Sequence, residues 1–238
     1  NSLLTLVSWN QFSHRNYPPI MPNAFNNTKE YADNDFSRNL ISYKYYWNSG
    51  RVELKSAYFH ERQDYFLESY TSNGLPVTQI NTLNKSDVFR QIVDLQQDLF
   101  RSWKLYAKVQ YDYEGVTSSD YDDDADTRKN RDILSFYAAL DGKIYRDLDL
   151  RMTLRNDIVD DKSAGFFPTA TLTYRMPFVK GLSFNAGYSH NYRNPTLNDL
   201  YWNPGGNENL KAENGKTFDF DINYLYENVN FNLDFRSG

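Results

Sequence analysis

Apolar and polar residues alternate along most of this chain. The clearest example covers residues 104–113, where the apolar positions are Leu105, Ala107, Val109, Tyr111 and Tyr113. A period of two places successive side chains on opposite faces of a strand. The pattern therefore predicts strands with one apolar and one polar face, and we count eleven of them along the chain.

The connections predicted between these strands alternate between long and short. Long loops are expected at residues 13–35, 64–84, 115–130 and 193–215, and one of medium length at 159–165. Short turns are expected at residues 48–50, 101–102, 146–147, 179–181 and 227–228. Transmembrane β-barrels have short turns at one end and longer loops at the other. The pattern thus predicts an all-β, antiparallel, up-and-down transmembrane barrel rather than a soluble sandwich or propeller.

Aromatic residues stand beside the predicted short turns. They are Trp47, Trp103, Tyr145, Phe178 and Tyr226. A transmembrane barrel has an aromatic girdle at each membrane interface, and the short turns lie close to one of them. The alternative is that aromatic residues are simply common in the strands of an aromatic-rich chain. The polar faces carry Lys, Arg, Asp, Gln and Thr, as a water-filled lumen allows.

Composition narrows the class of protein. Aromatic residues make up 17% of the 238 residues, which suits strands. The absence of cysteine excludes disulfides and Cys-based metal sites. A net charge of -5 argues against a nucleic-acid surface. No apolar stretch is long enough for a membrane helix, and no signal peptide is visible. The mean hydropathy of -0.75 still permits a barrel, because only alternate strand residues face lipid.

The longest patterned stretch that is not a strand covers residues 193–215. Its prolines, asparagines and Gly205-Gly206 pair are typical of loops and turns. It resembles the late barrel region of TonB-dependent outer-membrane receptors. The residues that carry the resemblance are Arg193, Pro195, Thr196, Leu197, Asp199, Leu200 and Tyr201, followed by Gly206, Asn207, Leu210, Lys211 and Glu213. The chain departs from the family pattern at Ala212, where a proline is usual, and around residues 218–220.

The resemblance implies an integral protein of the bacterial outer membrane. Such receptors bind a scarce, bulky nutrient with their extracellular loops and import it by moving a plug domain. An inner-membrane energy-coupling protein drives that movement. Family barrels have about 22 strands, so residues 1–238 would form about half of one. The plug domain and the barrel remainder are expected outside this chain, since an open sheet in lipid leaves costly unpaired backbone groups. Candidate ligands are ferric siderophores, cobalamin or glycans.

Aromatic and arginine side chains in the loop are candidates for ligand contact, because such residues dominate binding hot spots. The candidates are Tyr192, Arg193, Tyr201, Trp202 and Asn203. Alternatively, Arg193 and Asp199 only hold the loop against the barrel wall. A motif that receptors for different ligands share cannot itself select a ligand.

An acidic run in a predicted outer loop is a candidate calcium site. Its carboxylates belong to Asp120, Asp122, Asp123, Asp124 and Asp126. Clustered carboxylates are hard oxygen ligands for Ca²⁺, but the spacing is not that of an EF-hand. The cobalamin receptors of the resembled family use calcium in outer loops, and this run is similar to theirs in composition only. The alternative is a solvated acidic loop.

Catalysis has little support in the sequence. His14, His60 and His190 are scattered without metal-ligand spacing, and no hydrolase or phosphate-loop motif is present. We therefore expect no enzyme and no catalytic residue. A passive porin is the alternative function, which would share the barrel pattern but lack the loop motif. An adhesin or purely structural barrel is a third class.

Overall fold

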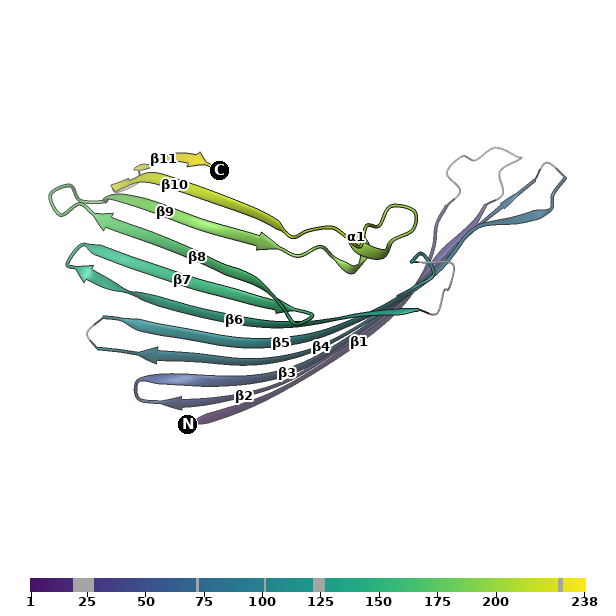
Figure 1. Cartoon of the computed structure of the whole chain (residues 1–238), viewed down its shortest axis with the longest axis horizontal. Coiled ribbons are helices and arrows are strands. Elements are labelled where there is room, and N and C mark those ends of the chain that lie inside the picture. Colours follow the sequence, from purple (N-terminus) through teal and green to yellow (C-terminus); the bar gives the residue numbers. More distant parts are fainter. Residues whose placement is uncertain (19–27, 72, 101, 122–126, 227–228) are drawn as a thin grey trace.

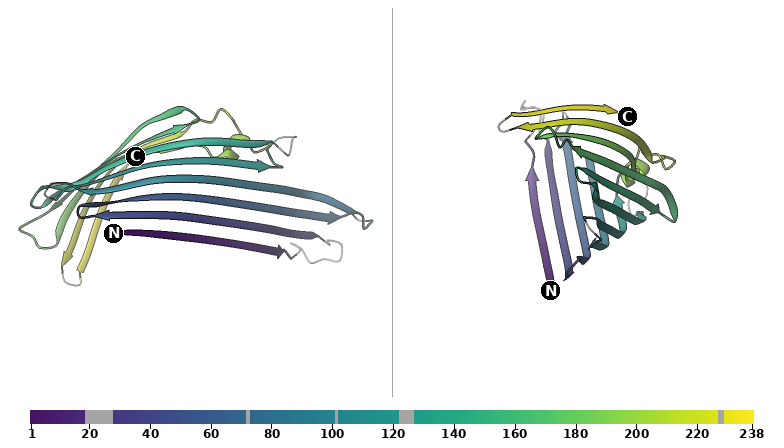
Figure 2. Two further views of the ribbon diagram at one scale, coloured as in Figure 1. Left: turned by 90° about the horizontal axis from the view of Figure 1, so that it is seen from below. Right: turned by 90° about the vertical axis from the view of Figure 1, so that its left-hand side faces the viewer.

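In the part of the chain that the structure describes, eleven strands form one antiparallel sheet and follow one another in chain order. The computed structural model describes residues 1–18, 28–71, 73–100, 102–121, 127–226 and 229–238. The strands are β1 (Ser2–Asn16), β2 (Lys29–Trp47), β3 (Gly50–Tyr70), β4 (Pro76–Asp98), β5 (Lys104–Ser118), β6 (Arg128–Tyr145), β7 (Leu148–Val159), β8 (Lys162–Arg175), β9 (Leu182–Arg193), β10 (Glu213–Tyr226) and β11 (Val229–Ser237). A short helix, α1 (Leu197–Tyr201), lies between β9 and β10. The sheet is curved and open, with β1 and β11 at its edges (Figures 1 and 2). The predicted strand number and all-β class are confirmed.

Within the described residues, no helix is both long enough and apolar enough to cross a membrane.

The strand register separates an apolar face from a polar face. One cross-strand row on the apolar face consists of Leu54, Val93, Val109 and Phe136. Their exposed fractions are 47%, 47%, 40% and 40%. Polar residues on the opposite face are far less exposed, at 5% for Glu53 and 2% for Asp157. A soluble protein would shelter the apolar residues instead, so this wide apolar face needs a cover such as lipid.

Charged side chains on the polar face pair with one another. Arg90 donates from Nε and Nη2 to the two carboxylate oxygens of Asp112, at 2.7 and 2.9 Å. Glu53 accepts a 2.7 Å hydrogen bond from the Ser42 hydroxyl and lies 3.3 Å from the Lys55 ammonium. A sheltered charge is tolerated only when it is paired. The sheltered carboxylates of Asp112 and Glu53 on the polar face are therefore both paired with a neighbouring cation.

Several strands continue where the sequence predicted long loops. Residues 64–84 were expected as a loop, yet β3 runs to Tyr70 and β4 starts at Pro76, and Asp64 pairs with Leu83 within them. The predicted loops at 13–35 and 115–130 are shortened in the same way. Backbone pairing needs no apolar face, so a strand that projects beyond the apolar band loses the alternation that would reveal it. These loop boundaries were wrong.

The connection between β7 and β8 is a tight turn rather than the predicted medium loop. The chain reverses through Asp160 and Asp161, with φ values of 46° and 64°. Aspartate tolerates this left-handed region because its short side chain can bond locally. The turn is shorter than the connection at residues 176–181, at the other end of the sheet. The prediction that long and short connections alternate strictly is therefore wrong. Many outer connections are lengthened by extended strands rather than by long loops.

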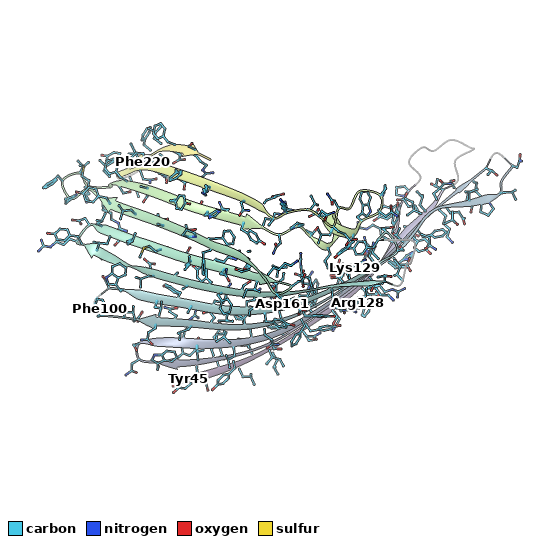
Figure 3. All side chains as sticks on the ribbon, viewed as in Figure 1. Tyr45, Phe100, Arg128, Lys129, Asp161 and Phe220 are labelled. Atoms are coloured by element: carbon cyan, nitrogen blue, oxygen red, sulfur yellow. The ribbon has the colours of Figure 1, made fainter. Side chains whose placement is uncertain are left out.

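Aromatic side chains gather at the end of the sheet where the turns were predicted to be short. The indoles of Trp47 and Trp103 lie over Gly50 and Gly142, where a Cβ atom would come within 2.8 and 2.5 Å of the ring. Tyr145 and Phe178 are exposed at the same end, and Figure 3 labels Tyr45 and Phe100 there. The Tyr226 side chain lies outside the described part. These aromatic side chains lie at the end of the sheet where the sequence predicted an aromatic girdle at the membrane interface.

Candidate functional site

The connection between β9 and β10, residues 194–212, is called the β9–β10 segment below. Its base is closed by strand pairing between Arg193 and Glu213. The Arg193 Nη1 and Glu213 Oε2 atoms lie 3.6 Å apart, and both side chains are largely exposed. An exposed ion pair stabilises a fold by only about 0–1 kcal/mol. The strand pairing, more than this ion pair, sets where the segment starts and ends.

A capping box starts helix α1 inside this segment. Thr196 is the N-cap: its amide donates to Asp199 Oδ2 at 2.8 Å, and its Oγ1 accepts from the Asp199 amide at 3.1 Å. These bonds satisfy amides that a helix start leaves open. The bond from the Thr196 amide, then the one to its side chain, lowers the pKa of Asp199, and nearby Arg193 adds to this. Leu197 is directed inward and is buried.

Two side-chain hydrogen bonds join the segment to residues far away in the sequence. The Tyr121 hydroxyl donates to Asn198 Oδ1 at 2.5 Å. Arg131 Nη1 donates to the Pro195 carbonyl at 2.6 Å. Tyr121 follows β5 and Arg131 lies on β6, so the segment reaches beyond β7 and β8 to make these contacts (Figure 1).

Two further contacts lie beside these bonds. The Lys129 ammonium is 4.5 Å from the ring centroid of Tyr201, a cation–π distance. The Asn203 amide donates to the Asp120 carbonyl at 2.7 Å. Burial raises the pKa of the Asp120 carboxyl, and burial together with the Asp120 charge raises the pKa of Tyr121. The segment thus packs against the outer end of β5 and β6 over several residues.

A cavity of about 500 Å³ lies between the start of α1 and the polar face of β3–β6. Its lining includes Glu61, Gln63, Ser86, Glu114, Arg131, Leu197 and Asn198. Arg131 donates to Glu114 from Nε at 3.0 Å, so these two charges are paired. Small-molecule sites have volumes of roughly 300–1,000 Å³ and mix apolar walls with a few fixed polar groups. This cavity has the size and chemistry of such a site.

The structure places the five predicted ligand-contact residues around the segment. Tyr192 stacks on Phe167, with ring centroids 4.5 Å apart. Arg193 is at the base, Tyr201 is beside Lys129, and Asn203 uses its backbone to reach the wall. The five residues are thus spread along the segment and its base rather than gathered at one point.

Trp202 is the most accessible aromatic side chain of the five, at 49% exposed. Its indole lies against Gly205, where a Cβ atom would come within 2.8 Å, and lines a smaller cavity of about 310 Å³ with Leu210. The segment contributes Thr196, Leu197 and Asn198 to the larger cavity instead. Ligand contact by the five residues stays a prediction.

The predicted calcium ligands fall mostly outside the described residues. Asp120 is described, whereas Asp122, Asp123, Asp124 and Asp126 are not. In the part of the chain that is described, no group of three or more histidine, aspartate or glutamate side chains could hold a metal ion. The calcium site stays a prediction.

Sequence reasoning missed the wall residues of the cavity. Tyr121 carried a signal, since it is the one aromatic residue within the acidic run. It is 2% exposed, which an acidic solvated loop does not explain. Arg131 and Glu61 carried no signal, because a charged residue on the polar face of a strand is ordinary in this chain.

A family model described as TonB dependent receptor-like, beta-barrel matches residues 3–235. The chain belongs to this family of TonB-dependent receptors. It is therefore part of an integral outer-membrane barrel, whose apolar face meets lipid and whose polar face lines the lumen. The family assignment gives no support to a passive porin.

The chain resembles individual family members only in part. It is 29% identical over 92 residues to the vitamin B12 transporter BtuB of Photobacterium profundum, which is 38% of this chain and 15% of that protein. Its fold matches the ferric enterobactin receptor PfeA of Pseudomonas aeruginosa with a TM-score of 0.62, at 13% identity, over 97% of this chain and 42% of that one. The siderophore receptor PirA of Acinetobacter baumannii gives a TM-score of 0.65 at 12% identity, with the same coverage.

A copper transporter, OprC, has the same fold, with a TM-score of 0.61 at 11% identity over 94% of this chain and 44% of that one. The chain thus spans less than half the length of these solved structures. These relatives are receptors and transporters rather than enzymes.

Proposed function

We propose that the complete protein is an active-transport receptor that binds a scarce, bulky nutrient at its outer mouth and imports it with TonB-type energy coupling. The observation that carries this proposal is the β9–β10 segment, which folds over the polar face and roofs a cavity of about 500 Å³. The segment is bonded to the wall through Tyr121 and Arg131, so that a structured outer connection borders the cavity. The coupling partner is an inner-membrane protein that acts through a plug domain.

The nutrient is a ferric siderophore, cobalamin or a glycan. Similarity to a vitamin B12 transporter and, in fold, to a ferric enterobactin receptor supports the first two. The cavity lining does not favour one of them by charge, because Arg131 and Glu114 neutralise each other and leave Glu61 and Lys85 of opposite sign.

Uptake by cells tests the transport proposal. The complete receptor is expressed in a strain without its own receptors, and uptake of labelled cyanocobalamin, ferric enterobactin and a maltodextrin is measured with and without the coupling protein. We expect saturable uptake of one probe, and only with the coupling protein present. Uptake that is linear in concentration and independent of coupling would instead show a passive pore.

A matched pair of substitutions tests the ligand contacts. Trp202→Ala removes an exposed aromatic of the segment, and Tyr145→Ala removes one at the opposite end of the sheet. If Trp202 contacts the nutrient, its loss weakens binding of the transported probe about tenfold or more, as for a hot-spot residue. Tyr145→Ala should leave the dissociation constant unchanged. Unchanged affinity of both variants removes Trp202 from the site.

A further inference from the structure

The β7–β8 hairpin is shorter than the strand beside it. β6 begins at Arg128, but its pairing with β7 begins at Ile133, opposite Val159. The outer end of β6 therefore extends past the β7–β8 turn, and Figure 3 shows Lys129 beyond Asp161. The barrel wall thus has a step in height between β6 and β7.

The β9–β10 segment reaches across this step to β5 and β6. Its two side-chain bonds join residues that are 77 and 64 positions apart in the sequence, Tyr121 to Asn198 and Arg131 to Pro195. Tyr121 is 2% exposed, and the Arg131 side chain is 11% exposed. A buried polar group that loses its partner is costly. Both bonds therefore favour the position in which the segment rests against the outer ends of β5 and β6, called the closed position below.

The same two residues also line the cavity that α1 roofs. Tyr121 holds the first turn of the helix through Asn198, and Arg131 holds its approach through Pro195. Arg131 is itself oriented by Glu114 on β5, which accepts from Nε at 3.0 Å. A planar guanidinium fixed on one side by a carboxylate can present its remaining donors in a defined direction.

We propose that Tyr121 and Arg131 are positioning residues that hold α1 over the cavity, so that α1 is a roof that the nutrient must displace to enter or leave. The proposal deepens the proposed function and rests on it, since a roof controls access only where a nutrient binds. The nutrient would then be retained by the closed segment as well as by its contacts with the wall.

Cysteine labelling tests the roof without any ligand. Residues 1–238 contain no cysteine, and any cysteine elsewhere in the complete receptor is first replaced by serine. A single Ser86→Cys substitution in the cavity lining then reports access from outside in membranes. The probe is a charged, water-soluble methanethiosulfonate reagent. Ser135→Cys on β6, which is not among the cavity-lining residues, is the control position.

Two substitutions should open the roof. Tyr121→Phe removes only the hydroxyl, and Arg131→Lys keeps the positive charge but removes the planar guanidinium and its several N–H donors. Tyr113→Phe is the matched control, because its hydroxyl donates to Asn130 at 2.9 Å away from the cavity. We expect the first two variants to label Ser86→Cys about tenfold faster, which corresponds to about 1.4 kcal/mol, with Ser135→Cys and Tyr113→Phe unaffected. They should also release the transported probe, cyanocobalamin or ferric enterobactin, faster.

The outcomes separate the two proposals. Equal labelling of Ser86→Cys in the parent and in both roof variants would overturn the positioning role. Equal acceleration at Ser86→Cys and Ser135→Cys would overturn it as well, because the barrel as a whole would then be loosened. Faster labelling with an unchanged release rate of the bound probe would refute the roof as a control on the nutrient. Faster labelling in a receptor that binds no probe would support Tyr121 and Arg131 as positioning residues. It would at the same time refute the proposed function.

Discussion

The assignment of faces makes a sharp prediction at two adjacent residues near the middle of β5. Val109 lies on the apolar face between Val93 and Phe136, and Gln110 lies on the polar face between Ile92 and Ser135. Val109→Lys would place an ammonium against lipid. Gln110→Lys would place the same group in the wet lumen, where Gln110 now donates to Asp112 at 2.8 Å.

The two substitutions should differ greatly in their cost. A lysine that faces lipid near the bilayer midplane destabilises a barrel by about 2–4 kcal/mol, whereas a lumen substitution has little effect on stability. The difference corresponds to roughly thirty- to several-hundred-fold in the unfolding equilibrium constant. Proximity to the carboxylate of Asp112 should keep the cost of Gln110→Lys small.

Urea unfolding of the complete receptor in phospholipid vesicles, followed by tryptophan fluorescence, measures both variants against the parent. We expect Val109→Lys to lower the urea midpoint strongly with an unchanged slope, and Gln110→Lys to leave it nearly unchanged. An equal loss for the two, or a larger loss for Gln110→Lys, would refute the assignment of faces.

Three further predictions follow from single sites. Gly142→Ala puts a Cβ atom 2.5 Å from the indole of Trp103, so we expect a loss of about 1–3 kcal/mol in the same unfolding assay; an unchanged midpoint would show that the indole moves freely. The lowered pKa of Asp199 means that its capping bond with Thr196 stabilises α1 above the ordinary carboxyl pKa and is lost as the pH falls through the folded-state value. The protection factor of the α1 amides, which is the intrinsic exchange rate divided by the observed rate, should therefore fall on acidification, and Asp199→Asn should remove that pH dependence. Calorimetric titration with Ca²⁺ tests the acidic run: saturable heat that Asp120→Asn weakens supports a calcium loop, and its absence leaves a solvated one.

The local sequence pattern was sufficient to predict the strands near the membrane. Around Val109 and Gln110, every second side chain faces lipid, so apolar and polar residues alternate along the strand. The same pattern fails at residues 64–84, where the β3–β4 extension projects beyond the apolar band and lipid no longer imposes the alternation. The tight β7–β8 turn was missed because Asp160 and Asp161 do not carry the glycine that usually marks such a turn.

The candidate site was predicted to the correct segment but not to its contacts. The motif at residues 193–215 pointed to the β9–β10 segment, and its Thr196 and Asp199 formed a cap as their spacing allows. Nothing in that stretch indicated that Pro195 and Asn198 would meet Arg131 and Tyr121. Those partners depend on how far each strand of the wall extends.

The sequence by itself determined the class of fold, the two faces of the strands and the family, because these are recorded in short-range periods and in one local motif. The tertiary structure decided where the β9–β10 segment rests, which residues surround the cavity and that Tyr121 is buried. These features arise from contacts between residues that lie 64 to 77 positions apart. Such contacts form only once the sheet has set its register and brought the ends of β5, β6, β9 and β10 together.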